Sequence, residues 1–482
     1  MTGAATAAAR SRAALGAAPG WLFPVLLAIP FLVGIAVLKG LTVEIDTFHG
    51  SDARVYQLPT ILQLSERLDF SSYPSAQTPL YHLLTVAWGE LVGFELWKLR
   101  LLNVAFSYGA ALALLRLLRR ATPLEPWQAF ALTVVFVLSP YFFGASFTLL
   151  TDNLAILFAL LALERIDRFR GDGSLVTFAT ACLWIAGAVL TRQAFLWLVL
   201  VAAWFLARSP APLPRRGAAA ALLGVALVPL AALVVEWGGL VPPSADPASC
   251  GLCTDRPGVG RDALTLRTVG FTVAVLGAYA ACIFGPGLAR RALAWRTPGG
   301  STRSSVTAGG AARSSGARCG RPAAGRGDLA GLLRSGAASP VGVQLAIAVA
   351  VGILLLAVSP LAYQPIVPGQ AGDAGYLWKI SARAPVALGS SLVFWLLVPL
   401  GCVAALLLVR RAGFGSLPAV YLAAFLIAAL PVRLVYQKYF DPFVLLALGL
   451  FARPPDLRAR WDYAGVAVVC VASVGYAISF AG

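Results

Sequence analysis

"WLFPVLLAIPFLVGIAVLKG", residues 21–40, is a nearly unbroken apolar run of the length that crosses a lipid bilayer. Similar runs recur throughout the 482 residues, of which 59% are hydrophobic and only 12% are charged, about half the charge of a soluble domain. Helices satisfy their own backbone in lipid, and these runs are too long for barrel strands. The sequence therefore predicts an all-α polytopic membrane protein. No typical cleavage site follows residue 40, so we expect the first run to remain as a signal-anchor.

About thirteen transmembrane helices are predicted from the apolar runs. Their expected ranges are 21–40, 99–117, 127–145, 152–164, 173–190, 193–207, 217–237, 265–287, 340–362, 386–409, 417–432, 439–452 and 463–481. With the N-terminus inside, a long first outer loop covers 41–98. An amphipathic surface helix is expected in it from the mostly helical spacing of Tyr56, Leu58, Ile61, Leu62, Leu64 and Leu68. Segment 79–94 is expected as a further helix that lies on the outer surface or re-enters from it.

The formal net charge of +17 is explained by topology rather than by a nucleic-acid partner. The predicted inner loops collect most of the 38 lysines and arginines, as the positive-inside rule requires, and the outer side is left nearly neutral. Anionic lipid at the inner surface would attract the same basic residues. The Gly/Ser/Arg-rich stretch 288–339 is predicted to be a disordered basic cytoplasmic loop.

Polar residues gather on the predicted outer side. "VEIDTFHGSDARVY", residues 43–56, carries Glu44, Asp46, His49 and Asp52 directly after the first span. Four other outer segments contribute Asp152, Arg192, Gln193, Asp373, Tyr376, Trp378, Lys379, Arg433, Tyr436, Gln437 and Lys438. Ionisable groups bordering a bilayer are costly, and their default interpretation is functional. Each has a plainer alternative, such as a solvated loop acid or a basic chain reaching for headgroups. Together they suit an anionic lipid headgroup approached from within the membrane.

The seven cysteines are scattered, and most fall inside predicted spans, where a small buried apolar residue is the ordinary interpretation. Cys250 and Cys253 lie in a loop that we expect outside, a compartment that permits disulfides. A disulfide and two free thiols both remain open for this pair, and a metal site would need more ligands than the surrounding sequence offers.

Six stretches resemble, in order and spacing, the dolichyl-phosphate-glucose α-1,2-glucosyltransferases of the endoplasmic reticulum, and more widely the GT-C membrane glycosyltransferases. They are "EIDTFHGSDARVY" (44–56), "KLRLLNVAFSYG" (98–109), "LTRQAFLW" (190–197), "EWGGLV" (236–241), "GYLWK" (375–379) and "PVRLVYQKYF" (431–440). The resemblance implies a single GT-C-type membrane domain over 1–482. Two positions depart from the family: Ile45 stands where the first acid of its opening motif would be, and its Asp-Asn-Arg-His-Tyr loop is not preserved before Tyr376.

The resemblance implies transfer of a hexose from a polyprenyl- or dolichyl-phosphate sugar to a hydroxyl of a glycan or lipid acceptor at the outer membrane face. An alcohol needs a carboxylate to take its proton, and we assign that role to Asp46, with Glu44, His49 and Asp52 as supporting residues. The departing phosphate needs fixed positive charge, which Arg192, Arg433 and Lys438 would supply. Sugar or acceptor contacts are expected from Asp152, Gln193, Trp378 and Tyr436. A single displacement would invert the anomeric centre.

Three points stay open at the level of sequence. No cofactor is required when basic side chains neutralise the phosphate, although Glu44, Asp46, His49 and Asp52 could instead hold a divalent ion. A lipid-linked glycan ligase or flippase would share the basic outer pocket without needing Asp46. A secondary transporter predicts inverted repeats, which the sequence does not display. A bacterial cytoplasmic membrane with the site outside is expected, with the endoplasmic reticulum as the alternative.

The charge distribution makes a topology prediction that labelling can test. A cysteine placed at Ser305, in a background without other reactive cysteines, should be protected from an impermeant thiol reagent in intact cells. A cysteine at Ser71 should react under the same conditions. The opposite pattern would invert the topology and place the outer polar cluster on the cytoplasmic side.

Overall fold

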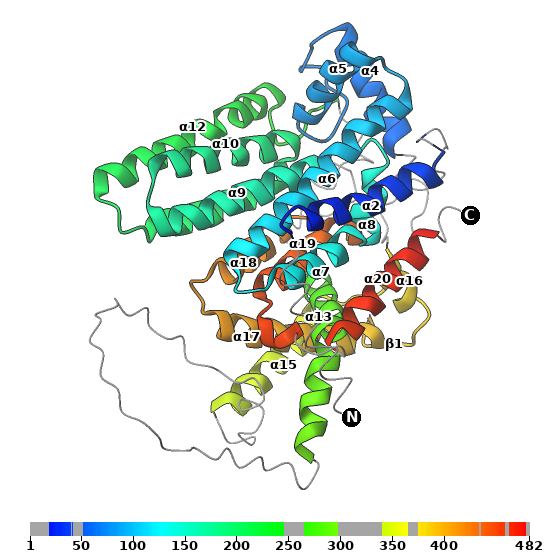
Figure 1. The fold of residues 1–482 in the computed structure, drawn as a ribbon, viewed down its shortest axis with the longest axis vertical. Coiled ribbons are helices and arrows are strands. Elements are labelled where there is room, and N and C mark those ends of the chain that lie inside the picture. The colour runs from blue at the N-terminus through cyan, green and yellow to red at the C-terminus, as the bar shows by residue number, and fades with distance from the viewer. Residues whose placement is uncertain are drawn as a thin grey trace.

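A computed structural model of the chain describes residues 19–39, 41, 52–244, 265–296, 340–364, 375–432, 435–457 and 462–478. These residues are mostly helical (Figure 1). The N-terminal half contains α2 (Leu22–Val37), α4 (Leu58–Glu66), α5 (Leu80–Val92), α6 (Leu96–Ala121), α7 (Pro126–Val137), α8 (Pro140–Ser146), α9 (Asp152–Asp172), α10 (Leu175–Thr191), α11 (Trp197–Ala207) and α12 (Leu213–Trp237). The C-terminal half contains α13 (Leu266–Arg296), α15 (Pro340–Val358), α16 (Tyr376–Ser381), α17 (Leu392–Ala412), α18 (Leu417–Ala429), α19 (Asp441–Phe451) and α20 (Asp462–Ile478).

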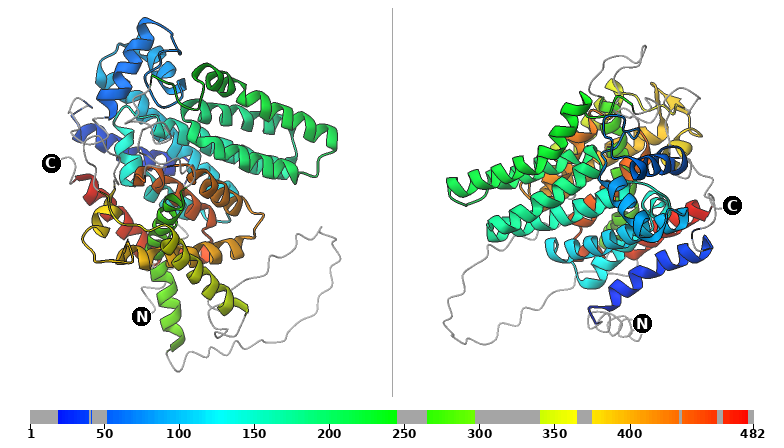
Figure 2. Two further views of the ribbon diagram at one scale, coloured as in Figure 1. Left: turned by 180° about the vertical axis from the view of Figure 1, so that it is seen from behind. Right: turned by 90° about the horizontal axis from the view of Figure 1, so that it is seen from above.

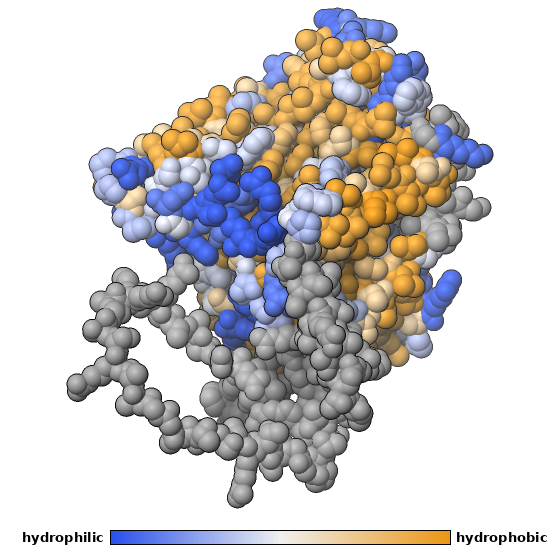
Figure 3. Space-filling model, viewed as in Figure 1, coloured by the Kyte–Doolittle hydropathy of each residue, from blue (hydrophilic) through white to orange (hydrophobic). Residues whose placement is uncertain are grey.

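Each predicted span contains a helix, and several helices have the length to cross a bilayer. Among the described residues, α6, α12, α17 and the segment Leu266–Gly287 of α13 are long and apolar enough to do so. The bent pair α7 and α8 would add a fifth span. Large apolar side chains such as Leu32, Val225 and Val351 are exposed, and Figure 3 shows a surface that is largely hydrophobic around a compact hydrophilic patch. These features support an integral membrane protein, while the full set of thirteen spans stays a prediction.

The predicted span 127–145 is broken in the structure. Helices α7 and α8 meet at an angle of 73°. Pro140 lacks an N–H and disfavours a helical backbone at Ser139, whose ψ is 137°. The Ser139 hydroxyl then accepts a hydrogen bond from the Phe142 N–H and begins the second helix. The apolar composition concealed this turn, because apolar residues continue through both helices.

Two other predicted boundaries differ from the structure. The range 386–409 begins with a small antiparallel hairpin, β1 (Val386–Ala387) and β2 (Ser390–Ser391), turned by Leu388 and Gly389 at φ values of 50° and 76°. The expected all-α fold therefore contains one short sheet. At 288, where the disordered loop was expected to start, α13 continues to Arg296, because "LARRALAW" consists largely of strong helix formers. Residues 297–339, the rest of this predicted loop, lie outside the described residues.

Amphipathic helices are present in the expected outer loop. Helix α4 buries Ile61 and Leu64, and α5 fills most of the segment 79–94 while burying Tyr81 and His82. A π-helical turn, η1 (Ala53–Gln57), precedes α4. Such turns are rare and often occur at functional sites.

Helices α9, α10 and α12 run side by side and project from the rest of the molecule (Figures 1 and 2). In the other half, α13 packs against α17, α19 and α20. Helix α19 joins the two halves, because it also contacts α6, α7 and α8. Every residue of α19 except Phe443 is buried. A helix that is apolar on all sides is expected to sit in the core in this way.

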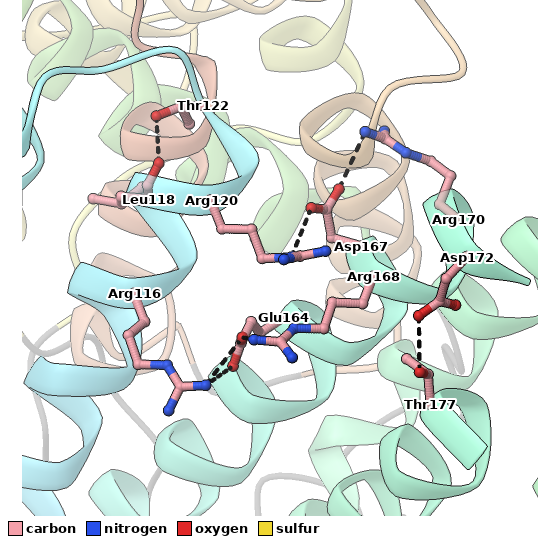
Figure 4. A network of polar contacts seen from close by, with 10 residues as sticks. All are labelled: Arg116, Leu118, Arg120, Thr122, Glu164, Asp167, Arg168, Arg170, Asp172 and Thr177. Atoms are coloured by element: carbon pink, nitrogen blue, oxygen red, sulfur yellow. Dashed lines mark hydrogen bonds and ion pairs between the residues drawn. The ribbon is translucent and has the colours of Figure 1, made fainter. Parts of the chain in front are cut away.

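One end of the α6–α9 pair is tied by charged side chains (Figure 4). The Glu164 carboxylate lies 3.2 Å from an Arg116 nitrogen and 2.7 Å from an Arg168 nitrogen. Asp167 is similarly shared by Arg120 and Arg170. Each carboxylate thus forms ion pairs with two arginines, on the side that we predict to be cytoplasmic.

Glycines allow α13 and α17 to pack at backbone contact. A Cβ added at Gly401 would lie 1.9 Å from the Val273 carbonyl oxygen, and one at Gly277 would lie 2.3 Å from the Leu397 oxygen. Both obstacles are helix backbone and cannot rotate away. Small residues at helix crossings are the usual means of close approach in membranes.

Gly401→Ala should therefore destabilise the protein by about 1–3 kcal/mol through overpacking, although alanine is the better helix former. Thermal unfolding in detergent would measure the change. Gly475→Ala is the matched control, since a Cβ there meets nothing within 4 Å. A Gly401→Ala protein as stable as this control would show that the α13–α17 contact is looser than described.

Candidate active site

A cavity of about 120 Å³ lies where both halves of the chain meet around α19. Both polar and apolar side chains line it. The polar side chains are Gln77, Tyr141, Asp152, Asn153, Arg192, Gln193, Lys438 and Tyr439. The apolar wall comes from Ala76, Ala145, Leu150, Ile156, Ala194, Phe195, Trp197, Val241, Phe425, Ala428, Ala429, Val432, Phe440, Pro442 and Phe443. A ligand bound here would contact both kinds of side chain, so the lining suits an amphipathic molecule.

Arg192 reaches the cavity because α10 ends just before it. Its backbone is extended, with φ −150° and ψ 117°, which turns the chain into the short 3₁₀ helix η2 (Gln193–Leu196). The guanidinium forms an ion pair with Asp152, the first residue of α9, and 13% of the Arg192 side chain is exposed. Only part of the donor capacity of the guanidinium is used by this contact, since arginine carries five N–H donors.

Lys438, from the C-terminal half of the chain, also lines the cavity. It lies in the 3₁₀ helix η3 (Gln437–Tyr439), and its Nζ is 2.8 Å from Oδ2 of Asp52. Asp52 directly precedes the π-helical turn η1. The ion pair joins residues 386 positions apart, so it closes the first outer segment onto the start of α19.

Tyr439 connects the two ion pairs. The Arg192 guanidinium lies 5.3 Å from the centroid of the Tyr439 ring, and Lys438 Nζ lies 5.4 Å from it. Both cations are thus within cation–π range of a single ring. The sequence analysis did not select Tyr439, although it follows Lys438 directly within "PVRLVYQKYF".

Burial and charge act in opposite directions on these cations. Burial alone would lower the pKa of the Arg192 guanidinium, but Asp152 and Tyr439 outweigh it and raise the pKa above its usual value. Burial also acts to lower the pKa of Lys438, and Tyr439 and Asp52 likewise reverse the shift. Both groups therefore stay charged at neutral pH, as binding of an anion would require.

A buried hydrogen-bond chain orients Gln77 at the cavity wall. The Tyr73 hydroxyl is 2.5 Å from Nδ1 of His82, and Nε2 of His82 is 2.7 Å from Oε1 of Gln57. Gln57 in turn donates from Nε2 to Oε1 of Gln77 at 3.1 Å. Burial lowers the pKa of His82 to about 3, so its ring is neutral and the direction of the chain is fixed. Gln77 lines the cavity, and its Oε1 is held by this chain.

Asn153 lies beside Asp152 in the cavity lining. It is fully buried, and its Nδ2 lies within hydrogen-bond distance of Ser107, Phe142 and Ser146. Its Oδ1 has no hydrogen-bond partner within the part of the chain that the structure describes. Asn153 follows Asp152 in "LLTDN", which the sequence places at the outer start of a span, but no site role was predicted for it.

Asp441 forms a buried network beside the cavity. Its carboxylate accepts hydrogen bonds from Tyr279 at 2.7 Å, and from Tyr376 and Gln437 at 3.1 Å each. The Tyr376 N–H donates to the hydroxyl of Tyr141, which lines the cavity. This network joins α13, α16 and α19, and it was not anticipated from sequence because the apolar run around Asp441 suggested only a span.

Three other residues were predicted to contact the sugar or the acceptor, and each has different surroundings in the structure. Gln193 lines the cavity, but its Nε2 donates to the carbonyl oxygens of Ala76 and Leu240. Trp378 is fully buried away from the cavity lining, with Nε1 bonded to the Val435 oxygen at 2.8 Å. Tyr436 packs against Tyr439 at 5.8 Å between ring centroids. A role in sugar binding stays a prediction for all three, and Trp378 has a packing role in this structure.

Four predicted site residues, Glu44, Asp46, His49 and Arg433, lie outside the described residues. Within the described ranges no cluster of three or more His, Cys, Asp or Glu side chains is suited to a metal ion. Three of the four residues that could instead hold a divalent ion, Glu44, Asp46 and His49, lie outside the described residues. Metal dependence therefore stays open. Cys250 and Cys253 also lie outside the described ranges.

No protein-family model matches the chain, and no curated protein sequence matches it significantly. Among solved structures, the chain overlaps with ArnT from Cupriavidus metallidurans in the apo state at a TM-score of 0.39 and 16% sequence identity. The overlap covers 88% of this chain and 77% of that one. That score is too low to indicate a shared fold, so the overlap by itself says nothing about activity.

We expect lysine at position 192 to bind a phosphate less tightly than arginine does. Arg192→Lys keeps the charge beside Asp152 but loses the planar fork that suits a phosphate. We expect it to weaken binding of a polyprenyl phosphate about tenfold, as for loss of one charge-assisted hydrogen bond. Arg192→Ala should weaken binding further.

Binding of the lipid phosphate to purified protein and thermal unfolding should be measured together. Arg267→Lys is the control, because Arg267 also faces an aromatic ring, that of Trp378 at 5.0 Å, but does not line the cavity. If Arg192→Lys changes affinity no more than the control does, Arg192 has only a structural pairing with Asp152.

Proposed function

We propose that this chain is an inverting membrane glycosyltransferase that transfers a hexose from a polyprenyl-phosphate donor to a lipid-linked or other hydroxyl acceptor. The supporting observation is the cavity in which Arg192 and Lys438 flank Tyr439 beside an apolar wall. A phosphate matches the cations, and an isoprenoid tail matches the apolar part. The lining has the composition of a small-molecule site, and because its volume of about 120 Å³ is below the roughly 300–1,000 Å³ usual for such sites, binding of the whole donor would require the cavity to widen.

The donor phosphate would bind at the cation end. Arg192 retains N–H groups beyond those directed at Asp152, and the Lys438 ammonium would add a second positive charge beside it. As the bond from the anomeric carbon to the phosphate oxygen breaks, its electrons pass to that oxygen. The added negative charge would then be stabilised by both cations in a site of low polarity.

Attack on the anomeric carbon requires a base on the acceptor side. Asp46 is the proposed base: it would take the hydroxyl proton while the acceptor oxygen bonds to the anomeric carbon from the face opposite the phosphate. Asp46 precedes Asp52 by six residues in the sequence, which reach at most roughly 20 Å. The ion pair of Asp52 with Lys438 brings the described end of this segment to a residue that lines the cavity.

The polar walls beside the cations would orient the sugar. Gln77, held by the chain from Tyr73, would contribute a donor, and Asn153 lines the cavity beside Asp152. Asp152 can accept from a sugar hydroxyl with the oxygen that Arg192 does not engage. A donor and an acceptor in fixed positions are suited to hydroxyl groups, which both give and accept hydrogen bonds.

Asp46→Asn tests the proposal. It should reduce turnover by about 10²-fold or more, as expected for loss of a general base, while binding of polyprenyl phosphate stays near the wild-type value. Turnover would be followed by mass spectrometry of lipid-linked glycans, first in a deletion strain to identify the substrate and then with purified protein. Glu66→Gln, on the exposed end of α4, is the matched control.

Near wild-type turnover of Asp46→Asn would exclude Asp46 as the base. If the variants at Arg192 also lost lipid-phosphate binding in that case, the cavity would serve a flippase or ligase instead. Loss of turnover with unchanged binding, together with a normal control, is the outcome that the glycosyltransferase requires.

A further inference from the structure

A second concavity lies between α11 and α12 and shares no lining residue with the first. It has a volume of about 580 Å³ and is largely open to its surroundings, so it is a groove rather than an enclosed pocket. Its walls are α11, from Val199 to Ala207, and α12, from Leu213 to Leu227. Apart from Arg216, all of its lining residues are apolar or glycine. We call it the α11–α12 groove.

Small residues keep the groove open. Gly217, Ala220 and Gly224 follow one another at helical spacing along the wall of α12. A Cβ added at Gly217 or Gly224 would meet nothing within 4 Å. These glycines therefore do not serve close contact between helices, in contrast to Gly277 and Gly401 in the α13–α17 contact. Their effect is to leave room for a slender apolar ligand.

The mouth of the groove is basic without neutralising acids. Arg216 lines it, and Arg208 and Arg215 flank the same turn between α11 and α12. No ion pair involves any of these three within the described parts of the chain, whereas the arginines of Figure 4 share Glu164 and Asp167. Arg216 makes one long hydrogen bond, 3.4 Å to the Ala207 oxygen, and its Nε has no partner among the described residues.

The positive N-terminal end of the α12 dipole adds to the positive charge of these arginines. Arg215 and Arg216 occupy the first turn of α12, which has no acid there. The positive end of a helix dipole disfavours cations and favours anions. A bound anion at this turn would thus be stabilised by both the arginines and the helix end, and it would relieve their mutual repulsion.

We propose that the α11–α12 groove binds an anionic phospholipid, with one acyl chain between the helices and the phosphate at Arg216. Helix α12 is suited to contact lipid, because only 17% of its most apolar window is buried inside the protein. The basic mouth lies on the side predicted to be cytoplasmic, where basic pockets between transmembrane helices bind anionic headgroups. The site is independent of the proposed glycosyl transfer.

Native mass spectrometry of delipidated wild-type protein with added phosphatidylglycerol or phosphatidylcholine tests the proposal. We expect tighter binding of phosphatidylglycerol. Arg216→Gln should weaken phosphatidylglycerol binding about fivefold and leave phosphatidylcholine unchanged, since it removes one contact between a basic side chain and an anionic lipid. Gly224→Leu should weaken both lipids by filling the groove.

Two variants control for charge and bulk. Arg119→Gln removes an exposed arginine from the end of α6, and Gly475→Leu adds bulk at an open glycine of α20. Equal binding of both lipids to the wild type, or equal effects of Arg216→Gln and Arg119→Gln, would overturn the proposal. So would a Gly224→Leu protein that loses a dimer while keeping its lipid affinity, because a second copy of the chain would then occupy the groove.

Discussion

Charge pairing in apolar surroundings is the constraint on which the candidate site depends. Arg192 and Lys438 are mostly buried, and an isolated cation in that setting would be strongly destabilised. Asp152 and Asp52 compensate them, and each pair joins segments that are distant in sequence. Breaking a buried pair by removing one partner typically costs about 3–5 kcal/mol. The pairs therefore hold four separate segments around Tyr439, and the cavity is the space that remains between them.

Helix α19 provides the support behind this arrangement. Its buried apolar residues bind the two halves of the chain, while its first residue, Asp441, collects hydrogen bonds from α13, α16 and η3. Since η3 also carries Lys438 and Tyr439, the position of both side chains depends on the anchoring of Asp441. Packing and polar contacts thus act on the same short stretch of chain, from residue 437 to residue 441.

Apolar runs were sufficient to predict where helices occur, because burial in lipid or in the core requires such runs. They could not predict the turn at Pro140 or the hairpin at Leu388, where local backbone geometry interrupts continuous hydrophobicity. The sequence also suggested that Arg192 and Lys438 would share a site, and both line one cavity. Tyr439, Gln77 and Asp441 were not foreseen, since their importance arises from contacts between distant segments. A single sequence gives no measure of such contacts.

The neutrality of the paired cluster has a consequence for selectivity. In the empty cavity each cation already has a carboxylate counter-ion, so anion uptake is an exchange rather than a simple addition. Inorganic phosphate or sulfate would compete with Asp52 and Asp152 without any compensating apolar contact. A lipid phosphate brings its own apolar surface, and about 25 cal/mol are gained for each Å² that it removes from water. The carboxylates would thus lower the affinity of the cations for soluble anions, while a lipid anion would still bind through the added contacts of its tail.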